Sequence, residues 1–90
     1  MVSVVIPVLN EAKILEQSLS RLITQLQGHE LIIVDGGSTD ETPLIAKKYG
    51  PVISSERGRA RQSNMGAAAA TGDILLFLHA DVWLEPGAIE

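Results

Sequence analysis

The sequence predicts an α/β fold with a Rossmann-like parallel sheet and helices on both faces of that sheet. Strand-like and helix-like segments alternate along all 90 residues, and the connections between strands are too long for hairpins. Such alternation is typical of right-handed βαβ crossovers. One strand-like run ends in an acidic residue, Asp35, and another leads into a short loop that ends in Asp81, at the point where open α/β sheets bind nucleotides. We expect one domain over residues 1–90, with its strands in the order 3-2-1-4.

Each element has a local signal. The apolar, β-branched run Val2–Val8 suits a strand covered on both faces, and Pro7 is expected to end its hydrogen-bond ladder. Asn10 is a candidate N-cap for an amphipathic helix that ends near Gly28, and Asp40 is a candidate cap for the next helix. The remaining predicted elements are strands at 30–35, 52–54 and 73–78 and helices at 41–49 and 60–71.

The loops that follow the strands carry the candidate binding residues. In the expected order these loops share one edge of the sheet, so Asn10, Asp35 and Asp81 should converge on one crevice. Asp35 can accept hydrogen bonds from a base or a ribose, and the alternative is a carboxylate that closes its own turn. Gly36 and Gly37 allow a close backbone approach to a ligand, although a plain tight turn explains them almost as well.

Metal and phosphate chemistry is expected at two further places. Asp81 is the best candidate ligand for Mg²⁺ or Mn²⁺, which prefer carboxylate oxygens. His79 has three open interpretations: a second ligand better suited to Mn²⁺, a hydrogen-bonding partner of a ribose, or a packed side chain. The arginines at 57, 59 and 61 either bind phosphate at the start of a helix or form a solvated basic turn.

The composition argues against several classes of function. The formal net charge is −4 and aromatic residues make up 3% of the chain, so a nucleic-acid-binding surface is not expected. The absence of cysteine excludes disulfides and Cys-ligated metals. No apolar run approaches the roughly 18 residues of a membrane-spanning helix. We expect a cytoplasmic location, with the inner face of the membrane as an alternative reached only through parts outside these residues.

The last predicted strand indicates that something covers it. The run at 74–78, ILLFL, is too apolar for the exposed edge that the expected strand order gives it. We therefore expect the chain to be the N-terminal half of a larger domain. The alternative is a small domain that covers this edge by forming a homodimer.

Three ordered motifs, VSVVIPVLNEA, ELIIVDGGSTDET and GRARQSNMGAAAATGDILLFLHAD, strongly resemble the N-terminal half of family 2 glycosyltransferases with the GT-A fold. The resemblance runs over nearly all 90 residues and looks closest to a bacterial subgroup. It implies a nucleotide-diphosphate sugar donor, commonly a UDP-sugar, together with a divalent metal, Mn²⁺ or Mg²⁺. It usually implies inversion at the anomeric carbon.

The resemblance also assigns roles to residues. It places Pro7, Asn10 and Glu11 in the first donor-binding loop and gives Asp35 the base. It identifies Arg61 and Asn64 as a pair lining the donor pocket, and His79-Ala80-Asp81 as the DxD element, with Asp81 on the metal. The full donor-binding set, which includes one turn glycine, is Pro7, Asn10, Glu11, Asp35, Gly37, Arg61, Asn64 and His79.

The chain departs from the family pattern in three places. His79 stands at the first position of the DxD element, and Leu9 stands where many relatives carry an aromatic that stacks on the base. The general base that an inverting transfer needs is expected beyond Glu90, so we expect the 90 residues alone to be inactive or nearly so. The acceptor is not indicated. The alternative function is a non-catalytic nucleotide-binding module, possibly dimeric.

Overall fold

The computed structural model describes residues 1–79, which form a parallel sheet with the strand order β3-β2-β1-β4. The predicted order and the parallel direction of the strands are both confirmed. The elements in chain order are β1 (Val2–Val8), α1 (Ala12–Leu22), the short 3₁₀ turn η1 (Ile23–Gln25), β2 (Glu30–Asp35), α2 (Thr42–Ala46), β3 (Val52–Ser54), α3 (Arg59–Ala69) and β4 (Ile74–Phe77).

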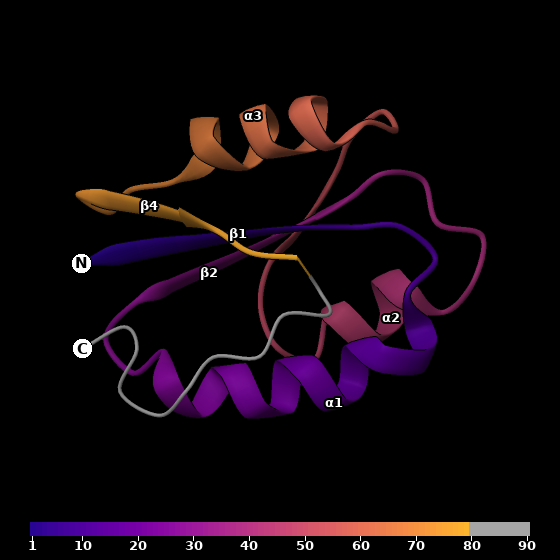
Figure 1. Cartoon of the computed structure of the whole chain (residues 1–90), viewed down its shortest axis with the longest axis horizontal. Coiled ribbons are helices and arrows are strands. Elements are labelled where there is room, and N and C mark those ends of the chain that lie inside the picture. The colour runs from indigo at the N-terminus through magenta and orange to yellow at the C-terminus, as the bar shows by residue number, and fades with distance from the viewer. Residues whose placement is uncertain (80–90) are drawn as a thin grey trace.

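Helices cover both faces of the sheet, as predicted. α1 and α2 lie on one face and α3 lies on the other (Figure 1). Successive side chains of a strand point to opposite faces, so β1 contributes to two separate cores. Val4 belongs to the larger core, with Leu15 and Leu19 of α1. Val5 belongs to the smaller core, with Val34, beneath α3. Each fully buried aliphatic side chain contributes about 1.5–3 kcal/mol.

α3 packs closely on the sheet because Gly66 has no side chain. A Cβ atom at Gly66 would lie 2.3 Å from Cγ1 of Val5 and 3.1 Å from Cγ2 of Val34, and both valines are fully buried. The helix begins at Arg59 and ends at Ala69, so it starts one residue before the predicted range and stops two residues short of its end. Gly66 therefore fixes how closely α3 lies against β1 and β2 at this point.

α1 begins at Ala12, so the prediction that Asn10 caps this helix was wrong. Glu11 occupies the N-cap position. Asn10 has a φ of 51°, in the left-handed region that Asn tolerates better than most residues. Its side chain bonds to a different loop, as described below. The amphipathic spacing is confirmed, because Leu15, Leu19 and Leu22 face the larger core. The helix was predicted to end near Gly28, whereas α1 ends at Leu22 and the 3₁₀ turn η1 follows it.

The prediction that Pro7 ends the ladder of β1 was right for one neighbouring strand and wrong for the other. The pairs between β1 and β4 stop at Val5, but the pairs with β2 continue through Pro7 and Val8. Val5 accepts a hydrogen bond from Leu78, on the β4 side, and Val8 accepts one on the β2 side. Pro7 alternates with Val5, so its missing N–H faces the side where pairing has already ended.

At the amino-terminal edge of the sheet, Glu30 links β1 to the segment between α3 and β4. Its Oε1 atom accepts hydrogen bonds from the Ser3 hydroxyl over 2.7 Å and from the backbone N–H of Thr71 over 2.9 Å. Ser3 Oγ accepts in turn from the N–H of Gly72 over 2.8 Å. The Thr71 N–H, followed by the Ser3 hydroxyl, lowers the pKa of the Glu30 carboxyl. This network fixes the segment that leads from α3 into β4.

β4 forms one edge of the sheet and exposes apolar side chains. Ile74, Leu75 and Phe77 are 60%, 42% and 48% exposed. Within residues 1–79 no further strand pairs with the outer side of β4. That the rest of a larger domain, or a second copy of the chain, covers this edge stays a prediction. No helix in the same part of the chain is both long and apolar enough to cross a bilayer.

Candidate donor site

A pocket of about 200 Å³ opens at the carboxyl-terminal edge of the sheet. The end of β1, the loop after it, the loop before α3, the first turns of α3 and the segment after β4 all contribute to its wall. The lining residues are Pro7, Val8, Leu9, Glu11, Arg57, Gly58, Arg59, Gln62 and His79. Pro7, Glu11 and His79 of the predicted donor-binding set are therefore brought together here, as the convergence of parallel strand ends requires.

The loop after β1 is tied to the loop after β2 by hydrogen bonds in both directions. The backbone N–H of Asn10 donates to Ser38 Oγ over 2.9 Å, and the N–H of Thr39 donates back to Asn10 Oδ1 over 2.8 Å. The N–H of Glu11 donates to Thr42 Oγ1, at the start of α2, over 2.8 Å. Each link crosses between the loops, so they are held in one arrangement.

Asp40 extends this tie to the first turns of two helices. Its Oδ2 atom accepts from the N–H of Ala12 over 3.3 Å, and its Oδ1 atom accepts from the N–H of Thr42 over 2.9 Å and from the Thr42 hydroxyl. These bonds, that of the hydroxyl first, lower the pKa of the Asp40 carboxyl. Asp40 was predicted to cap α2, but the N-cap position of that helix is Glu41. Asp40 lies one residue earlier, and it still accepts hydrogen bonds from Thr42 at the start of α2 and from Ala12 at the start of α1.

Asp35 ends β2 and closes the glycine turn that follows it. Its Oδ2 atom accepts from the N–H of Gly37 over 3.1 Å and from the N–H of Ser38 over 3.0 Å, and the Ser38 hydroxyl bonds to Oδ1. Gly37 has a φ of 97°, which favours glycine. Asp35 is 6% exposed and, with Asn10 and Gly37, lies outside the pocket lining. A contact between Asp35 and a base stays a prediction.

Gln62 reaches from α3 to the ends of two strands. Its Nε2 atom donates to the backbone oxygen of Val8 over 3.0 Å and to that of Val34 over 2.8 Å. Its Oε1 atom accepts from the N–H of Gly58 over 3.3 Å. The side chain is 4% exposed. Gln62 therefore connects three backbone segments beneath the pocket.

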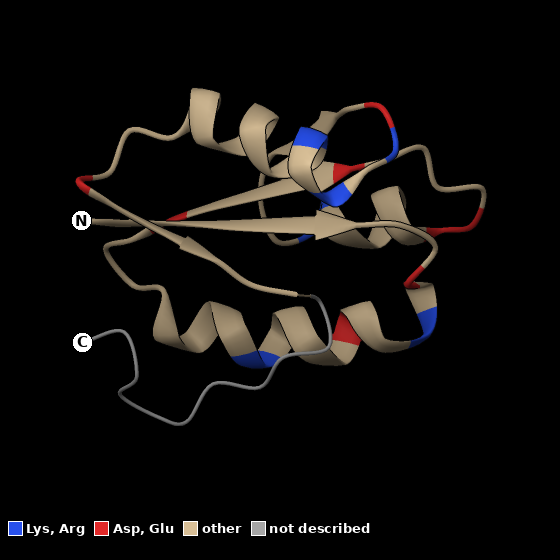
Figure 2. Cartoon of the chain, turned by 45° about the horizontal axis from the view of Figure 1, so that its top comes forward, with Lys and Arg blue, Asp and Glu red and all other residues tan. Residues whose placement is uncertain are grey.

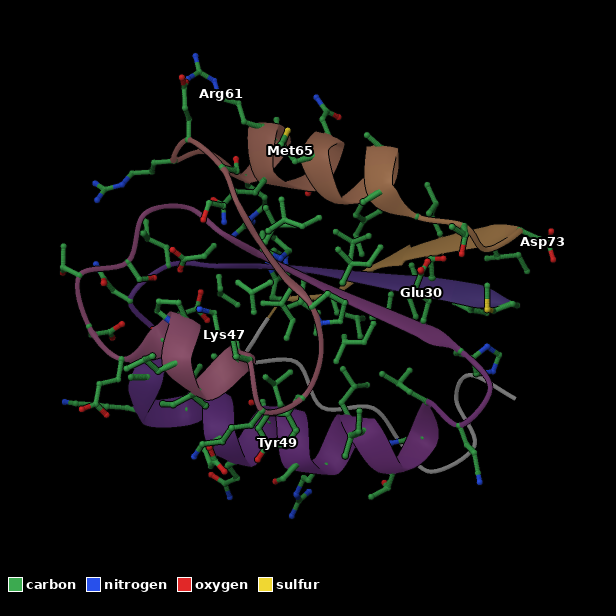
Figure 3. The ribbon with its side chains drawn as sticks, turned by 180° about the vertical axis from the view of Figure 1, so that it is seen from behind. Glu30, Lys47, Tyr49, Arg61, Met65 and Asp73 are labelled. Carbon is green, nitrogen blue, oxygen red and sulfur yellow. The ribbon has the colours of Figure 1, made fainter. Side chains whose placement is uncertain are left out.

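The arginines around the start of α3 divide between two places. Figure 2 shows basic residues at the start of α3 and in the loop before it. Arg57 and Arg59 line the pocket, and neither forms an ion pair within residues 1–79. Arg61 points away from the sheet (Figure 3) and pairs with Glu56. Arg61 and Asn64 line a separate, more open hollow of about 680 Å³ beside the end of β3.

Two side chains that could ligate a divalent ion lie together among the described residues. Glu11 and His79 line the same pocket, and both are groups that Mn²⁺ accepts. No cluster of three His, Asp or Glu residues that could hold an ion occurs among residues 1–79. The metal ligand predicted at Asp81 lies outside the described residues, as does Glu90. A divalent ion at this pocket therefore needs ligands beyond the described ones, such as a carboxylate or phosphate oxygens.

Comparison with known proteins identifies the family of this chain. The profile of Glycosyl transferase family 2 matches residues 3–90. The chain belongs to glycosyltransferase family 2. The resemblance inferred from the three motifs is thereby confirmed. One relative, the PGL/p-HBAD biosynthesis glycosyltransferase of Mycobacterium bovis (strain BCG / Pasteur 1173P2), is 41% identical over 90 residues, which cover 90% of this chain and 35% of the relative.

Solved structures of glycosyltransferases share the fold of this family 2 chain. The mannosyltransferase PcManGT from Pyrobaculum calidifontis, in complex with GDP-Man and Mn²⁺, aligns with a TM-score of 0.81 and 30% identity over 89% of this chain and 27% of its own. Glucosyl-3-phosphoglycerate synthase from Mycobacterium tuberculosis, in complex with Mn²⁺, UDP-Glc and phosphoglyceric acid, aligns with a TM-score of 0.78 and 33% identity over 90% of this chain and 33% of its own.

These comparisons confirm the GT-A fold, whose strand order the sequence predicted. The chain spans about a third of the length of the relatives it matches.

Sequence reasoning missed Gln62 as a site residue and gave Arg57 and Arg59 no individual role. A signal for Gln62 was present. Gln62 and Gly66 are four residues apart and therefore share one face of the helix. Since a glycine in an alanine-rich helix marks a close packing contact, that face is the one that meets the sheet. Arg61 lies off this face.

Proposed function

We propose that this chain forms the donor-binding part of a metal-dependent, inverting glycosyltransferase that uses a nucleotide-diphosphate sugar, with a UDP-sugar as the first choice. The pocket at the carboxyl-terminal edge of the sheet carries the proposal, because it combines two arginines without ion-pair partners in the described chain with Glu11 and His79. Family membership and the nucleotide-sugar and Mn²⁺ complexes of the structural neighbours support it.

The residues of the pocket and of the neighbouring segments have distinct parts in this proposal. Arg57 and Arg59 attract the diphosphate and stabilise the negative charge that grows on it as the sugar leaves. Asp81, together with His79, would hold the divalent ion, and that ion would supply further neutralisation of the leaving diphosphate. Asp35 and the turn that it closes face the nucleoside. The acceptor hydroxyl attacks in line and loses its proton to a general base located beyond Glu90.

Calorimetric titration with UDP and with GDP, each with and without Mn²⁺, tests this proposal. We expect UDP binding that depends on the metal and that is lost in Asp35→Ala and Asp81→Ala. Asp73→Ala is the matched control, because Asp73 lies exposed at the opposite edge of the sheet, where it pairs with the N-terminal amine (Figure 3). The control should bind as the unaltered protein does.

The other outcomes separate the alternatives. Nucleotide binding that is indifferent to metal favours a non-catalytic module. Tighter binding of GDP than of UDP retains the transferase but changes the donor. Failure to bind either nucleotide contradicts a donor site at this pocket.

A further inference from the structure

We propose that Gln62 is a positioning residue of this site, and that it sets where Arg57 and Arg59 stand relative to the ends of β1 and β2. The inference rests on the proposed function, since the placement of two arginines matters only if the pocket takes an anionic ligand. Gln62 itself is not proposed to contact the ligand.

The hydrogen-bonding groups of Gln62 are directed at the backbone. A glutamine amide has two N–H donors, and here one bonds to the oxygen of Val8 and the other to the oxygen of Val34. The amide oxygen accepts from Gly58. With 4% of its surface exposed, the residue has no N–H left for a substrate. Its effect on a ligand must therefore pass through the segments that it holds.

One of these segments is the turn that carries the arginines. Gly58 is bonded to Gln62 twice: its N–H donates to the side chain over 3.3 Å, and its carbonyl oxygen accepts from the backbone N–H of Gln62 over 2.9 Å. Gly58 has a φ of 136°, in a region that side-chain-bearing residues rarely adopt. Arg57 and Arg59 are its direct neighbours, so the conformation of Gly58 decides where both arginines leave the backbone.

The position of the Gln62 amide is itself fixed by packing. A Cβ atom on Gly36 would lie 2.7 Å from Oε1, 2.8 Å from Cδ and 3.0 Å from Nε2 of Gln62, so the amide lies directly against the backbone of the turn after β2. Four residues along the helix, Gly66 brings α3 down onto Val5. Gln62 therefore transmits the position of the strand ends to the arginine turn.

The test compares Gln62→Met in two backgrounds. Methionine keeps the length of the side chain and removes all three hydrogen bonds. In the otherwise unaltered protein we expect UDP affinity, measured with Mn²⁺, to fall about tenfold, the size of one lost charge-assisted hydrogen bond. In the Arg57→Ala/Arg59→Ala background we expect Gln62→Met to change affinity less than about twofold, because the groups that it positions are gone.

Two further measurements keep the test decisive. Gln17→Met makes the same substitution at an exposed site on α1 and should leave UDP affinity unchanged. Gln62→Glu keeps the acceptor for Gly58 and loses the donors at neutral pH, whereas its protonated form regains one donor. Relative to the unaltered protein, the UDP affinity of Gln62→Glu should therefore recover as the pH falls.

The inference is overturned if Gln62→Met weakens UDP binding by the same factor in both backgrounds, or if it leaves UDP binding unchanged. If Gln62→Met does not fold, a pH-independent UDP affinity of Gln62→Glu overturns it equally. An unaltered protein that binds neither UDP nor GDP would instead contradict the proposed function, so the two failures can be told apart.

Discussion

Replacing Gly66 with alanine should destabilise this protein even though alanine is the better helix former. The new Cβ atom would lie 2.3 Å from Cγ1 of Val5, whereas ordinary contact begins at 3.4 Å, so α3 or β1 must move by roughly 1 Å. Overpacking of this kind costs about 1–3 kcal/mol, and the gain in helix propensity offsets about 1 kcal/mol of it. The difference is a net loss of up to about 2 kcal/mol, and we expect its upper part because Val5 and Val34 are fully buried in a small core.

Urea unfolding followed by circular dichroism measures this loss as a lower midpoint with an unchanged slope. Ala68→Gly is the matched control, because position 68 is exposed on the same helix. The control should lose about 1 kcal/mol from helix propensity alone. Equal or greater stability of Gly66→Ala relative to the unaltered protein would refute the close packing described for α3.

Other parts of the structure yield predictions of the same kind. The pKa of the Glu30 carboxyl is lowered mainly by its hydrogen bond from Thr71, and that of the Asp40 carboxyl mainly by its hydrogen bond from Thr42. The stability that these carboxylates provide is therefore present above the ordinary carboxyl pKa and is lost as the pH falls through the lowered values. Urea unfolding between about pH 6 and pH 3 should therefore show a steeper acid loss in the unaltered protein than in Glu30→Gln or Asp40→Asn. Gly58→Ala forces a φ of 136° on a residue with a side chain, and we expect a cost of about 1–3 kcal/mol in the same assay together with weaker UDP binding. Unchanged stability of Gly58→Ala would show that the turn relaxes freely. Removal of divalent metal with EDTA should weaken UDP binding reversibly, with recovery on addition of Mn²⁺, as calorimetry can check.

Most of the sheet could be predicted because its signals are local. Strand-like runs alternate with helix-like spacing, and that alternation alone prescribes crossovers and parallel strands. The third strand was placed at 52–54, as the structure has it. Asn10 shows where local reasoning failed. Asparagine before a helix is a common cap, but here it bonds to Thr39, which is 29 residues away in the sequence. A partner at that distance overrides the local preference.

The site was predicted less completely for the same reason. The residues that line the pocket are few and scattered, and Pro7, Glu11 and His79 were identified through motif positions. Gln62 was not identified because its partners are strand carbonyl groups, 54 and 28 residues away, which any residue supplies. Which of the three arginines line the pocket depends on which face of α3 packs against the sheet. The structure shows that face, but the sequence analysis did not assign it.

The hydrogen bonds of Asn10 and Asp40 affect the free-energy cost of binding a ligand at the loops after β1 and β2. Ordering a flexible backbone costs about 1–2 kcal/mol of conformational entropy for each residue. Since the loops after β1 and β2 are already joined through these residues in the free protein, most of that cost falls on folding. Because these two loops are already ordered, little of a ligand's binding free energy would be spent on ordering them. Ligand binding should therefore produce only small backbone displacements in these loops.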